Sequence, residues 1–470
     1  MLPRGSKATL QQQIQQIVAD AIVMGRCTAG ERLPSSRRLA QHLGVSRITV
    51  TLAYSELVSN DYLYSRGGSG YYVAENAPRR PIFDDYPKGS ADGIDWKRRL
   101  RKTSPERDDI LRPSNWSDYR YPFIYGQSDM DLFDHANWRK CAMQAMGRKD
   151  FDSLTRDSYQ HDDPMLVEYI LRHILPRRGI HATPDELIIT LGSQNALWMI
   201  AYLLLDQAPK TVVENPCYPG LRKIFDQMGM VVTSVDVDDD GLPPENLPAD
   251  CDLVFTTPSH HAPTNATMPL ARRKALLDRA EQDDFLVVED DYEFEISFSS
   301  SPSPALKSLD RVGRVIYVSS FSKSIFPGLR LGYMVAAPEL IREVRRLRAV
   351  LLRHPPSHVQ RTTAYFLSLG HFDSQIHRMT RVYAQRRAIM EKGLRELDLG
   401  AVTPRASGGS SFWIKAPEGV DTFRLAMELR AQSVLIEPGQ AFLRAGRRTV
   451  HTIGLRIQPF RRTGSRQVWT

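Results

Sequence analysis

Residues 319–334 read SSFSKSIFPGLRLGYM and place Lys323 among small hydroxyl residues. The run directly before it, Val315-Ile316-Tyr317-Val318, is typical of a buried β-strand. A lysine in the turn after such a strand is either a solvated surface charge or an amine held at the edge of a sheet, where it can react. The rest of the chain favours the second interpretation.

Short β-branched runs recur along the chain and alternate with segments of helical length. They are ELIITLG at 186–192, KTVVENP at 210–216, VVTSVDV at 231–237, DLVFTTP at 252–258, FLVVEDD at 285–291 and RVIYVSS at 314–320. Strands separated by helices predict an α/β domain with a mainly parallel sheet. We assign residues 118–470 to this domain.

The first 74 residues follow a different pattern. Apolar residues at helical spacing over 10–24 are followed by two helical segments, 33–44 and 45–63, joined by a glycine-containing turn. Two aromatic strands around a Gly-Gly-Ser-Gly turn follow at 62–73. The pattern predicts a winged helix-turn-helix in residues 1–74.

In this fold the second helix enters the major groove of DNA with its first residues against base edges. Ser46, Arg47 and Thr49 are therefore the candidates to read sequence. Arg37 could reach a phosphate or a base, and Arg66 at the tip of the wing could enter an adjacent minor groove. The alternative for each arginine is a solvated charge on a small helical hairpin.

The region 75–117 is rich in proline and charge and sustains no apolar period, which indicates a linker. The whole chain carries 62 Lys and Arg against 54 Asp and Glu, a net charge of +8 that suits a polyanionic partner without identifying one. No apolar stretch approaches the length of a membrane span. We expect a soluble, cytoplasmic protein.

Histidine and cysteine do not indicate a metal site. The four cysteines are scattered without a CxxC pair, and the pair His260-His261 has no third ligand nearby in the sequence. We expect no metal, and reduced thiols.

Residues that could bind a phosphate surround Lys323. Ser320 and Ser322 offer hydroxyl groups, and Arg330 is close enough to act as a clamp. In LGSQNAL (191–197), Ser193 and Gln194 would begin a helix whose free N–H groups favour an anion.

A lysine that forms a Schiff base with pyridoxal phosphate also needs a carboxylate against the ring nitrogen. Asp290, at a strand end, can supply it, and Tyr292 can bond the phenolic oxygen of the ring. Tyr218, after another strand, could cover the ring or contact the substrate. The alternatives are an acidic loop that binds magnesium or only water, and a loop tyrosine packed for burial.

Two family resemblances follow from these motifs. The stretch LPSSRRLAQHLGVSRITVTLAYSELVSNDYLYSRGGSGYYV resembles the winged helix of the GntR regulators. The set LGSQNAL, ENPCYPG, TPSHHAPTN, EDDYEFE and SSFSKSIFPGLRLGY, over roughly 118–450, looks like the fold-type I aminotransferase domain. The fusion of the two looks like the MocR/GabR regulators.

The resemblance implies a large aminotransferase-like domain with a smaller C-terminal subdomain and a head-to-tail homodimer. It also implies that Lys323 holds pyridoxal phosphate as an internal aldimine, with Asp290 on the ring nitrogen and Tyr292 on the phenolic oxygen. Relatives usually read HQ, an aromatic residue and PTG where this chain has residues 261–265, so the wall of the pocket is altered. Leu52 stands where such proteins often carry arginine.

The leading hypothesis is a transcription regulator that binds operator DNA and senses a small amino compound through aldimine exchange at Lys323. One alternative is a pyridoxal phosphate-dependent aminotransferase. Another is a regulator of vitamin B6 synthesis that senses pyridoxal phosphate itself.

The end of the chain departs from the family. VLIEPGQAFL (434–443) matches, but the expected arginine strand YRLGYS, which would bind an amino-acid carboxylate, is absent. Back-translation of residues 451–469 in an alternative frame gives His-Tyr-Arg-Leu-Ala-Tyr-Ser, so we hypothesise a frame shift from about His451. The lost arginine codon would straddle Ile453 and Gly454. The alternative is a genuine divergent tail in which Arg456 binds the carboxylate.

Overall fold

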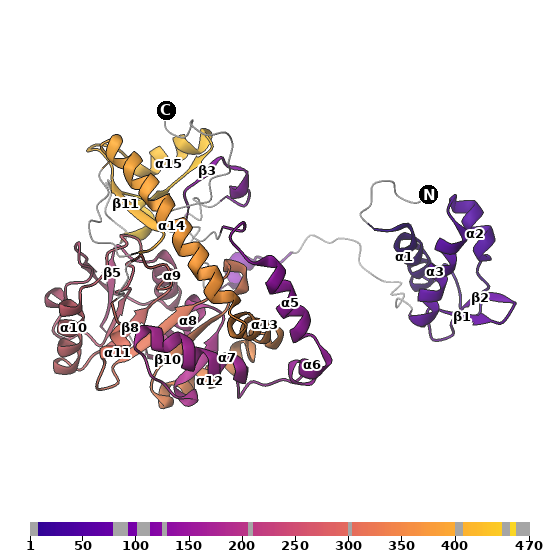
Figure 1. The fold of residues 1–470 in the computed structure, drawn as a ribbon, viewed down its shortest axis with the longest axis horizontal. Coiled ribbons are helices and arrows are strands. Elements are labelled where there is room, and N and C mark those ends of the chain that lie inside the picture. The colour runs from indigo at the N-terminus through magenta and orange to yellow at the C-terminus, as the bar shows by residue number, and fades with distance from the viewer. Residues whose placement is uncertain are drawn as a thin grey trace. The chain divides into compact units, whose positions relative to one another are not determined.

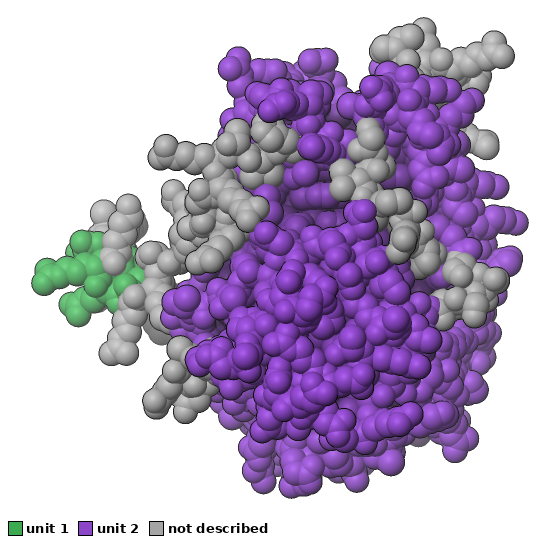
Figure 2. Space-filling model, turned by 90° about the vertical axis from the view of Figure 1, so that its left-hand side faces the viewer, with its two compact units in different colours: residues 1–101 green, residues 102–470 purple. Residues whose placement is uncertain are grey.

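The computed structural model describes residues 8–78, 93–100, 113–124, 129–204, 210–298, 303–399, 408–443 and 452–456. The chain divides into two compact units, Met1–Arg101 and Lys102–Thr470, which Figure 2 shows in different colours. Most of the predicted linker lies outside the described residues, and within it α4 (Trp96–Arg99) forms one helical turn.

The N-terminal unit is the predicted winged helix-turn-helix (Figure 1). Its elements are α1 (Leu10–Val23), α2 (Ser36–Leu43), α3 (Arg47–Ser59), β1 (Leu63–Arg66) and β2 (Gly70–Val73). Each helix follows a hydroxyl residue, Thr9, Ser35 or Ser46, whose side chain accepts a backbone N–H of the first turn. Gly44, in the left-handed conformation at φ +67°, ends α2 and opens the turn to α3.

The larger unit is built on a seven-stranded sheet in the order β4-β10-β9-β8-β7-β5-β6. The strands are β4 (Leu187–Thr190), β5 (Thr211–Asn215), β6 (Thr233–Asp236), β7 (Leu253–Thr256), β8 (Leu286–Asp290), β9 (Val315–Ser320) and β10 (Gly332–Val335). The prediction of a mainly parallel sheet is confirmed, because β10 alone among these strands runs antiparallel to its neighbours.

Helices cover both faces of this sheet. They are α5 (His135–Ala145), α6 (Arg148–Leu154), α7 (Pro164–Tyr169), α8 (Ser193–Leu204), α9 (Pro219–Met228), α10 (Leu270–Gln282), α11 (Leu306–Leu309), α12 (Pro338–Leu352) and α13 (Ser357–Ser368). Apolar residues of α8, α9 and α12 form one core with alternate strand residues such as Val288 and Val318. The intervening residues, such as Val287 and Tyr317, face α7, α10 and α13 on the other side.

A smaller C-terminal subdomain follows. It contains α14 (His371–Glu396), α15 (Thr422–Ala431) and an antiparallel sheet in the order β11 (Ser411–Lys415), β14 (Thr452–Arg456), β13 (Glu437–Pro438). β12 (Val434–Leu435) pairs in parallel with β3 (Tyr121–Pro122). Short turns of 3-10 or π helix occur at Trp116–Asp118, Ile170–Ile174, Leu175–Arg178, Pro184–Glu186, Pro244–Asn246, Pro327–Leu329 and Gly439–Phe442. Among the described residues, no helix combines the length and apolarity needed to cross a membrane.

Candidate functional site

The segments with predicted site residues meet at one edge of the large sheet. β5, β7, β8 and β9 are parallel, and β4 has the same direction because both β4 and β9 are antiparallel to β10. The loops at 191–193, 216–218, 257–265 and 321–323, together with the end of β8, therefore lie at the carboxyl edge of the sheet. This edge is where open α/β sheets bind their ligands.

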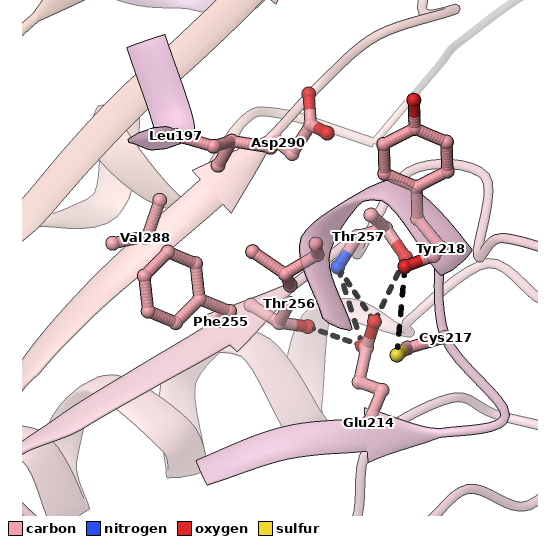
Figure 3. Close-up of a pocket in the computed structure, with 10 residues that line it drawn as sticks. Leu197, Glu214, Cys217, Tyr218, Phe255, Thr256, Thr257, Val288 and Asp290 are labelled. Atoms are coloured by element: carbon pink, nitrogen blue, oxygen red, sulfur yellow. Dashed lines mark hydrogen bonds between the residues drawn. The ribbon is translucent and has the colours of Figure 1, made fainter. Parts of the chain in front are cut away.

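A pocket at this edge contains Asp290 and Tyr218 (Figure 3). Its walls also include Leu197, Glu214, Cys217, Leu221, Phe255, Thr256, Thr257 and Val288. Oδ1 of Asp290 is buried and has no hydrogen-bond partner among the described residues. Burial, with the charges of Asp291 and Glu214, raises the pKa of Asp290 to about 8. A buried carboxylate without a donor suits a protonated ring nitrogen, so this residue fits the cofactor that the sequence predicts.

Glu214 lines the pocket and accepts hydrogen bonds from two threonines. Its carboxylate accepts from Thr256 Oγ1 at 2.6 Å and from Thr257 N and Oγ1 at 3.1 and 2.9 Å. His261 Nε2 lies 3.3 Å from Glu214 Oε2, and His261 Nδ1 lies 2.7 Å from Thr264 Oγ1. Burial acts to raise the pKa of Glu214, but His261 and the two threonines lower it below its usual range.

The histidine pair thus has a role that the sequence did not reveal. His261 helps to lower the pKa of Glu214, while burial lowers the pKa of its neighbour His260. Within the described parts of the chain, no group of three His, Cys, Asp or Glu residues could hold a metal ion.

The predicted phosphate ligands lie on or next to the ends of three adjacent strands, β4, β10 and β9. Ser320 on β9 and Thr190 on β4 both pair with Gly332 of β10. A Cβ atom on Gly332 would lie 2.6 Å from Ser319 O and 2.9 Å from Gly192 Cα, so only glycine permits this approach of the loops. The end of β9 and the start of α8, at Ser193, therefore converge.

Arg330 joins the same cluster. Its Nη2 donates to Leu191 O at 3.0 Å, and its guanidinium packs 3.3 Å from where a Cβ of Gly192 would be. Ser322 N donates to Ser320 Oγ at 3.1 Å, and the buried Ser322 Oγ has no hydrogen-bond partner among the described residues. A guanidinium, hydroxyl groups and a helix N-terminus are the donor set that binds a phosphate.

The other predicted residues occupy loops at this edge. Lys323 is half-buried in the turn after β9, Tyr292 is buried after β8, and Gln194 is exposed in the first turn of α8. Tyr218 caps α9 and folds over Gly220, where a Cβ would lie 2.4 Å from the tyrosine ring. The glycine therefore lets this ring lie against the backbone at the pocket.

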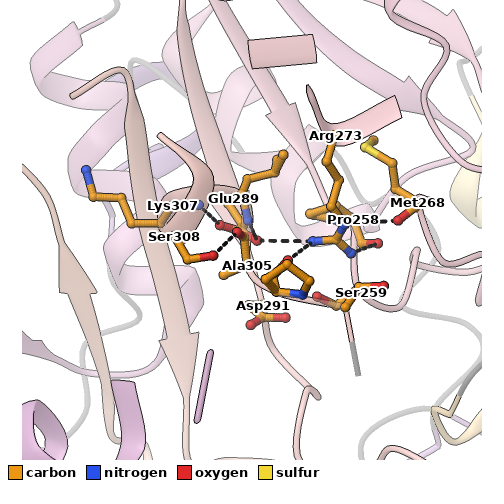
Figure 4. A network of polar contacts seen from close by, with 12 residues as sticks. Pro258, Ser259, Met268, Arg273, Glu289, Asp291, Ala305, Lys307 and Ser308 are labelled. Atoms are coloured by element: carbon orange, nitrogen blue, oxygen red, sulfur yellow. Dashed lines mark hydrogen bonds and ion pairs between the residues drawn. The ribbon is translucent and has the colours of Figure 1, made fainter. Parts of the chain in front are cut away.

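A buried network of charges, which sequence reasoning missed, includes Glu289 and Asp291, the two neighbours of Asp290 in the sequence (Figure 4). Arg273 donates to the carbonyls of Pro258 and Met268 at 2.7 and 2.9 Å, and so joins the two ends of the loop that carries His261. Glu289 accepts from the backbone N–H groups of Leu306 and Lys307 at 2.8 and 2.9 Å.

Arg178 extends this network to the loop that follows β8. It donates to Asp291 Oδ2 and to Ser259 Oγ, at 2.7 and 2.8 Å respectively. Asp291 Oδ2 also accepts from Tyr317 at 2.9 Å. The network therefore positions the loops that flank Asp290.

Asn265, at the position where the family resemblance leads us to expect glycine, has φ +63°. Its Nδ2 donates to Gly408 O at 2.7 Å and to Ser411 O at 3.3 Å, which ties the pocket loop to the C-terminal subdomain. Asparagine tolerates the left-handed conformation better than most residues. The altered motif is thus compatible with the turn and adds a contact.

We expect Asn265→Ala to lower the free energy of unfolding by about 2 kcal/mol, because alanine loses the hydrogen bonds and is strained at positive φ. Asn265→Gly is the matched control, since glycine relieves the strain and should recover about half of the loss. Urea unfolding measures both variants. Equal stability of the alanine variant and the unmodified protein would contradict this account.

The predicted DNA-contacting residues lie on the exposed side of the N-terminal unit. Arg37 and Arg47 are exposed, and the guanidinium of Arg66 lies 5.5 and 5.3 Å from the rings of Tyr64 and Tyr72. Ser46 Oγ accepts from Thr49 N at 3.1 Å and lies 2.8 Å from Thr49 Oγ1. These two hydroxyls therefore hold the first turn of α3, whatever else they contact.

Comparison with known proteins finds a matching family for each of the two units. Residues 10–73 match the bacterial regulatory proteins of the gntR family, and residues 126–458 match aminotransferase class I and II. The kynurenine aminotransferase of Pyrococcus horikoshii covers 77% of this chain and 93% of its own, with 27% identity and a TM-score of 0.69. The α-aminoadipate aminotransferase LysN of Thermus thermophilus covers the same shares at 25% identity and a TM-score of 0.68.

The relatives that match along most of this chain are regulators. The HTH-type transcriptional regulator TauR of Rhodobacter capsulatus is 54% identical over 441 residues, which cover 94% of this chain and 91% of TauR. The probable rhizopine catabolism regulatory protein MocR of Rhizobium meliloti is 31% identical, over 83% of this chain and 78% of MocR. The pyridoxine biosynthesis regulator PdxR of Corynebacterium glutamicum is 29% identical, over 86% and 82%.

The chain is therefore a transcription regulator with an aminotransferase-like domain. It belongs to the MocR-type regulators, in which a GntR winged helix is fused to an aminotransferase class I and II domain. Aminotransferases of this class depend on pyridoxal phosphate.

Proposed function

We propose that this regulator binds an operator in double-stranded DNA, holds pyridoxal phosphate on Lys323 and senses a small amino compound that displaces this lysine. The observation that carries the proposal is the buried, unpaired Oδ1 of Asp290 in a pocket at the carboxyl edge of the sheet. This site is present in a chain that also has a winged helix.

Different residues at the carboxyl edge of the sheet would bind different parts of the cofactor. Pyridoxal phosphate, when bound, supplies an aldehyde that condenses with primary amines. Asp290 would accept the ring N–H, and Tyr292 would bond the phenolic oxygen. The phosphate would be bound by the hydroxyl groups of Ser320 and Ser322 and by the guanidinium of Arg330. Ser193 and Gln194, in the first turn of α8, would add the N–H groups of a helix N-terminus. Tyr218 covers the ring or meets the effector.

An effector acts on DNA affinity only if it interacts differently with two states of the protein. An amino compound that bound the cofactor in place of Lys323 would leave the lysine side chain free. The active species is a cytoplasmic head-to-tail homodimer. Titration of DNA binding with pyridoxal phosphate alone, and then with added amines, distinguishes an amine sensor from a sensor of the cofactor itself.

The C-terminal tail matters for effector binding, because the family resemblance places a carboxylate-binding arginine there. β14 includes Gly454, which pairs with Trp413 and Glu437, while Arg456 pairs with Ser411. A Cβ at Gly454 would meet no atom closer than 3.6 Å, so a longer side chain can start from this position. This space is compatible with an arginine in the restored frame.

Sequencing of the encoding DNA tests the frame shift. A single-base correction that restores Tyr-Arg-Leu near residue 453 supports it, and the absence of such a correction supports a divergent tail. Residues 457–470 lie outside the described part of the chain.

We expect Arg47→Ala to weaken binding of a specific DNA duplex about 10-fold, because an exposed arginine at the start of α3 contacts a base or a phosphate. Arg26→Ala removes an exposed arginine outside the helix-turn-helix and is the control. Fluorescence anisotropy with a duplex selected from a randomised pool measures both affinities. Equal affinities would show that Arg47 is a solvated charge.

A further inference from the structure

Helix α3 is apolar on two opposite faces. Val50, Ala53, Tyr54 and Leu57 are buried in the core of the N-terminal unit. Ile48 and Leu52, in contrast, expose 71% and 50% of their surface. At 100° per residue these two side chains lie one turn apart, opposite the buried face. These two side chains are therefore not part of the core of this unit.

The position of the pair within α3 restricts what can cover it. Both residues lie in the first half of the helix, which is the half that enters the major groove in a helix-turn-helix. The hydroxyls of Ser46 and Thr49 are engaged with each other, and Thr51 Oγ1 donates to Arg47 O at 2.9 Å. The outward face of this half thus offers two apolar side chains and one guanidinium.

The charges around the pair match a polyanion. Arg37, Arg38 and Arg47 are exposed on α2 and α3, and Arg66 is exposed on the wing. The first acidic residue of α3 is Glu56, a full turn beyond Leu52. A second copy of the same surface would bring these arginines against one another, whereas phosphates on both sides of a groove would pair with them.

We propose that Ile48 and Leu52 contact the C5-methyl groups of thymines, so that the operator requires thymine at the positions that face α3. Thymine is the base that presents a methyl group in the major groove, and apolar side chains recognise it. This inference rests on the proposed DNA binding and extends it to the kind of base that is read. It also gives Leu52, where relatives often carry arginine, a role other than phosphate binding.

The test begins with selection of duplexes from a randomised pool by the intact protein, followed by sequencing. One selected duplex is then synthesised with each thymine replaced singly by deoxyuridine, which lacks only the methyl group. We expect uracil at the contacted positions to weaken binding by the unmodified protein about 3- to 10-fold. Ile48→Ala and Leu52→Ala should bind more weakly and lose this sensitivity, each at its own position.

Met24→Ala is the control, since Met24 is also exposed and apolar but lies at the end of α1. It should retain the full sensitivity to uracil. The dependence of affinity on salt should be the same in all variants, because no phosphate contact is removed. Thermal unfolding should be unchanged, because the two replaced side chains are exposed.

The outcomes separate the two levels of the proposal. Enrichment of specific duplexes whose binding is insensitive to uracil would overturn the thymine contacts and leave operator binding intact. Failure of the unmodified protein to enrich any sequence would overturn the proposed operator binding as well. A changed association state of Ile48→Ala in sedimentation would assign this face to a second copy of the chain and also overturn the inference.

Discussion

Asp290→Asn is expected to weaken the binding of pyridoxal phosphate about 100-fold or more. The carboxylate lies buried in the pocket, and its Oδ1 has no partner among the described residues. A protonated ring nitrogen would supply the missing charge, and removal of one partner of a buried pair costs about 3–5 kcal/mol. Asparagine keeps the size of the side chain but not its charge.

The same substitution should stabilise the cofactor-free protein at high pH. The pKa of Asp290 is raised to about 8 by burial and by the nearby carboxylates, from about 4 in an unfolded chain. Between these values the folded protein retains a proton that the unfolded chain releases, so stability falls as pH rises from about 4 to about 8. Asp290→Asn removes this loss and should be more stable at pH 8 by about 1–3 kcal/mol.

Titration with pyridoxal phosphate and urea unfolding at pH 5 and pH 8 measure the two effects. Asp278→Asn, at an exposed position on α10, is the control and should change neither. Undiminished cofactor affinity of Asp290→Asn would place the ring nitrogen elsewhere. An unchanged dependence of stability on pH would show that Asp290 is ionised in the cofactor-free protein.

Arg178→Met is expected to lower the free energy of unfolding by about 3–5 kcal/mol. Arg178 and Asp291 expose 3% and 0% of their side chains and are 2.7 Å apart. Methionine fills much of the same volume but leaves the buried carboxylate with hydroxyl groups, those of Tyr317 and Ser259, in place of a positive charge. The loss is therefore the cost of an uncompensated charge.

Two further variants give this prediction its controls. Arg177→Met breaks a neighbouring pair with Asp373 whose side chains are 44% and 45% exposed, and it should cost less than about 1 kcal/mol. Adding Asp291→Asn to Arg178→Met removes the buried charge and should recover part of the loss. Equal effects of the two single arginine variants, measured by urea unfolding, would contradict the role of burial.

The sequence predicts much of this architecture because local patterns carry it. Hydroxyl caps, Gly44 and the aromatic wing define the N-terminal unit, and six β-branched runs correspond to β4 through β9. β10 was not predicted, because GYMV lies inside the serine- and glycine-rich stretch that reads as turns. Its pairing with both β4 and β9 is a tertiary property.

The candidate site could be predicted only in part, because some of its contacts are also tertiary. Motifs single out Lys323, Asp290 and Arg330, but the charged network joins residues more than a hundred positions apart, such as Arg178 and Asp291. One signal for the charged network was present in the acidic run that ends β8. Alternation along a strand sends Glu289 and Asp291 to the face opposite Asp290. Those two carboxylates therefore need partners in the interior.

The central claim is that Lys323 holds pyridoxal phosphate, and peptide mapping after borohydride reduction tests it most directly. The intact protein is saturated with the cofactor, shows an absorbance band near roughly 420 nm where pyridoxal Schiff bases absorb, and is then reduced and digested. We predict a pyridoxyl group on the peptide that contains Lys323, and loss of both band and label in Lys323→Ala. A band and a label that persist in Lys323→Ala, or a label confined to other lysines, would contradict the account.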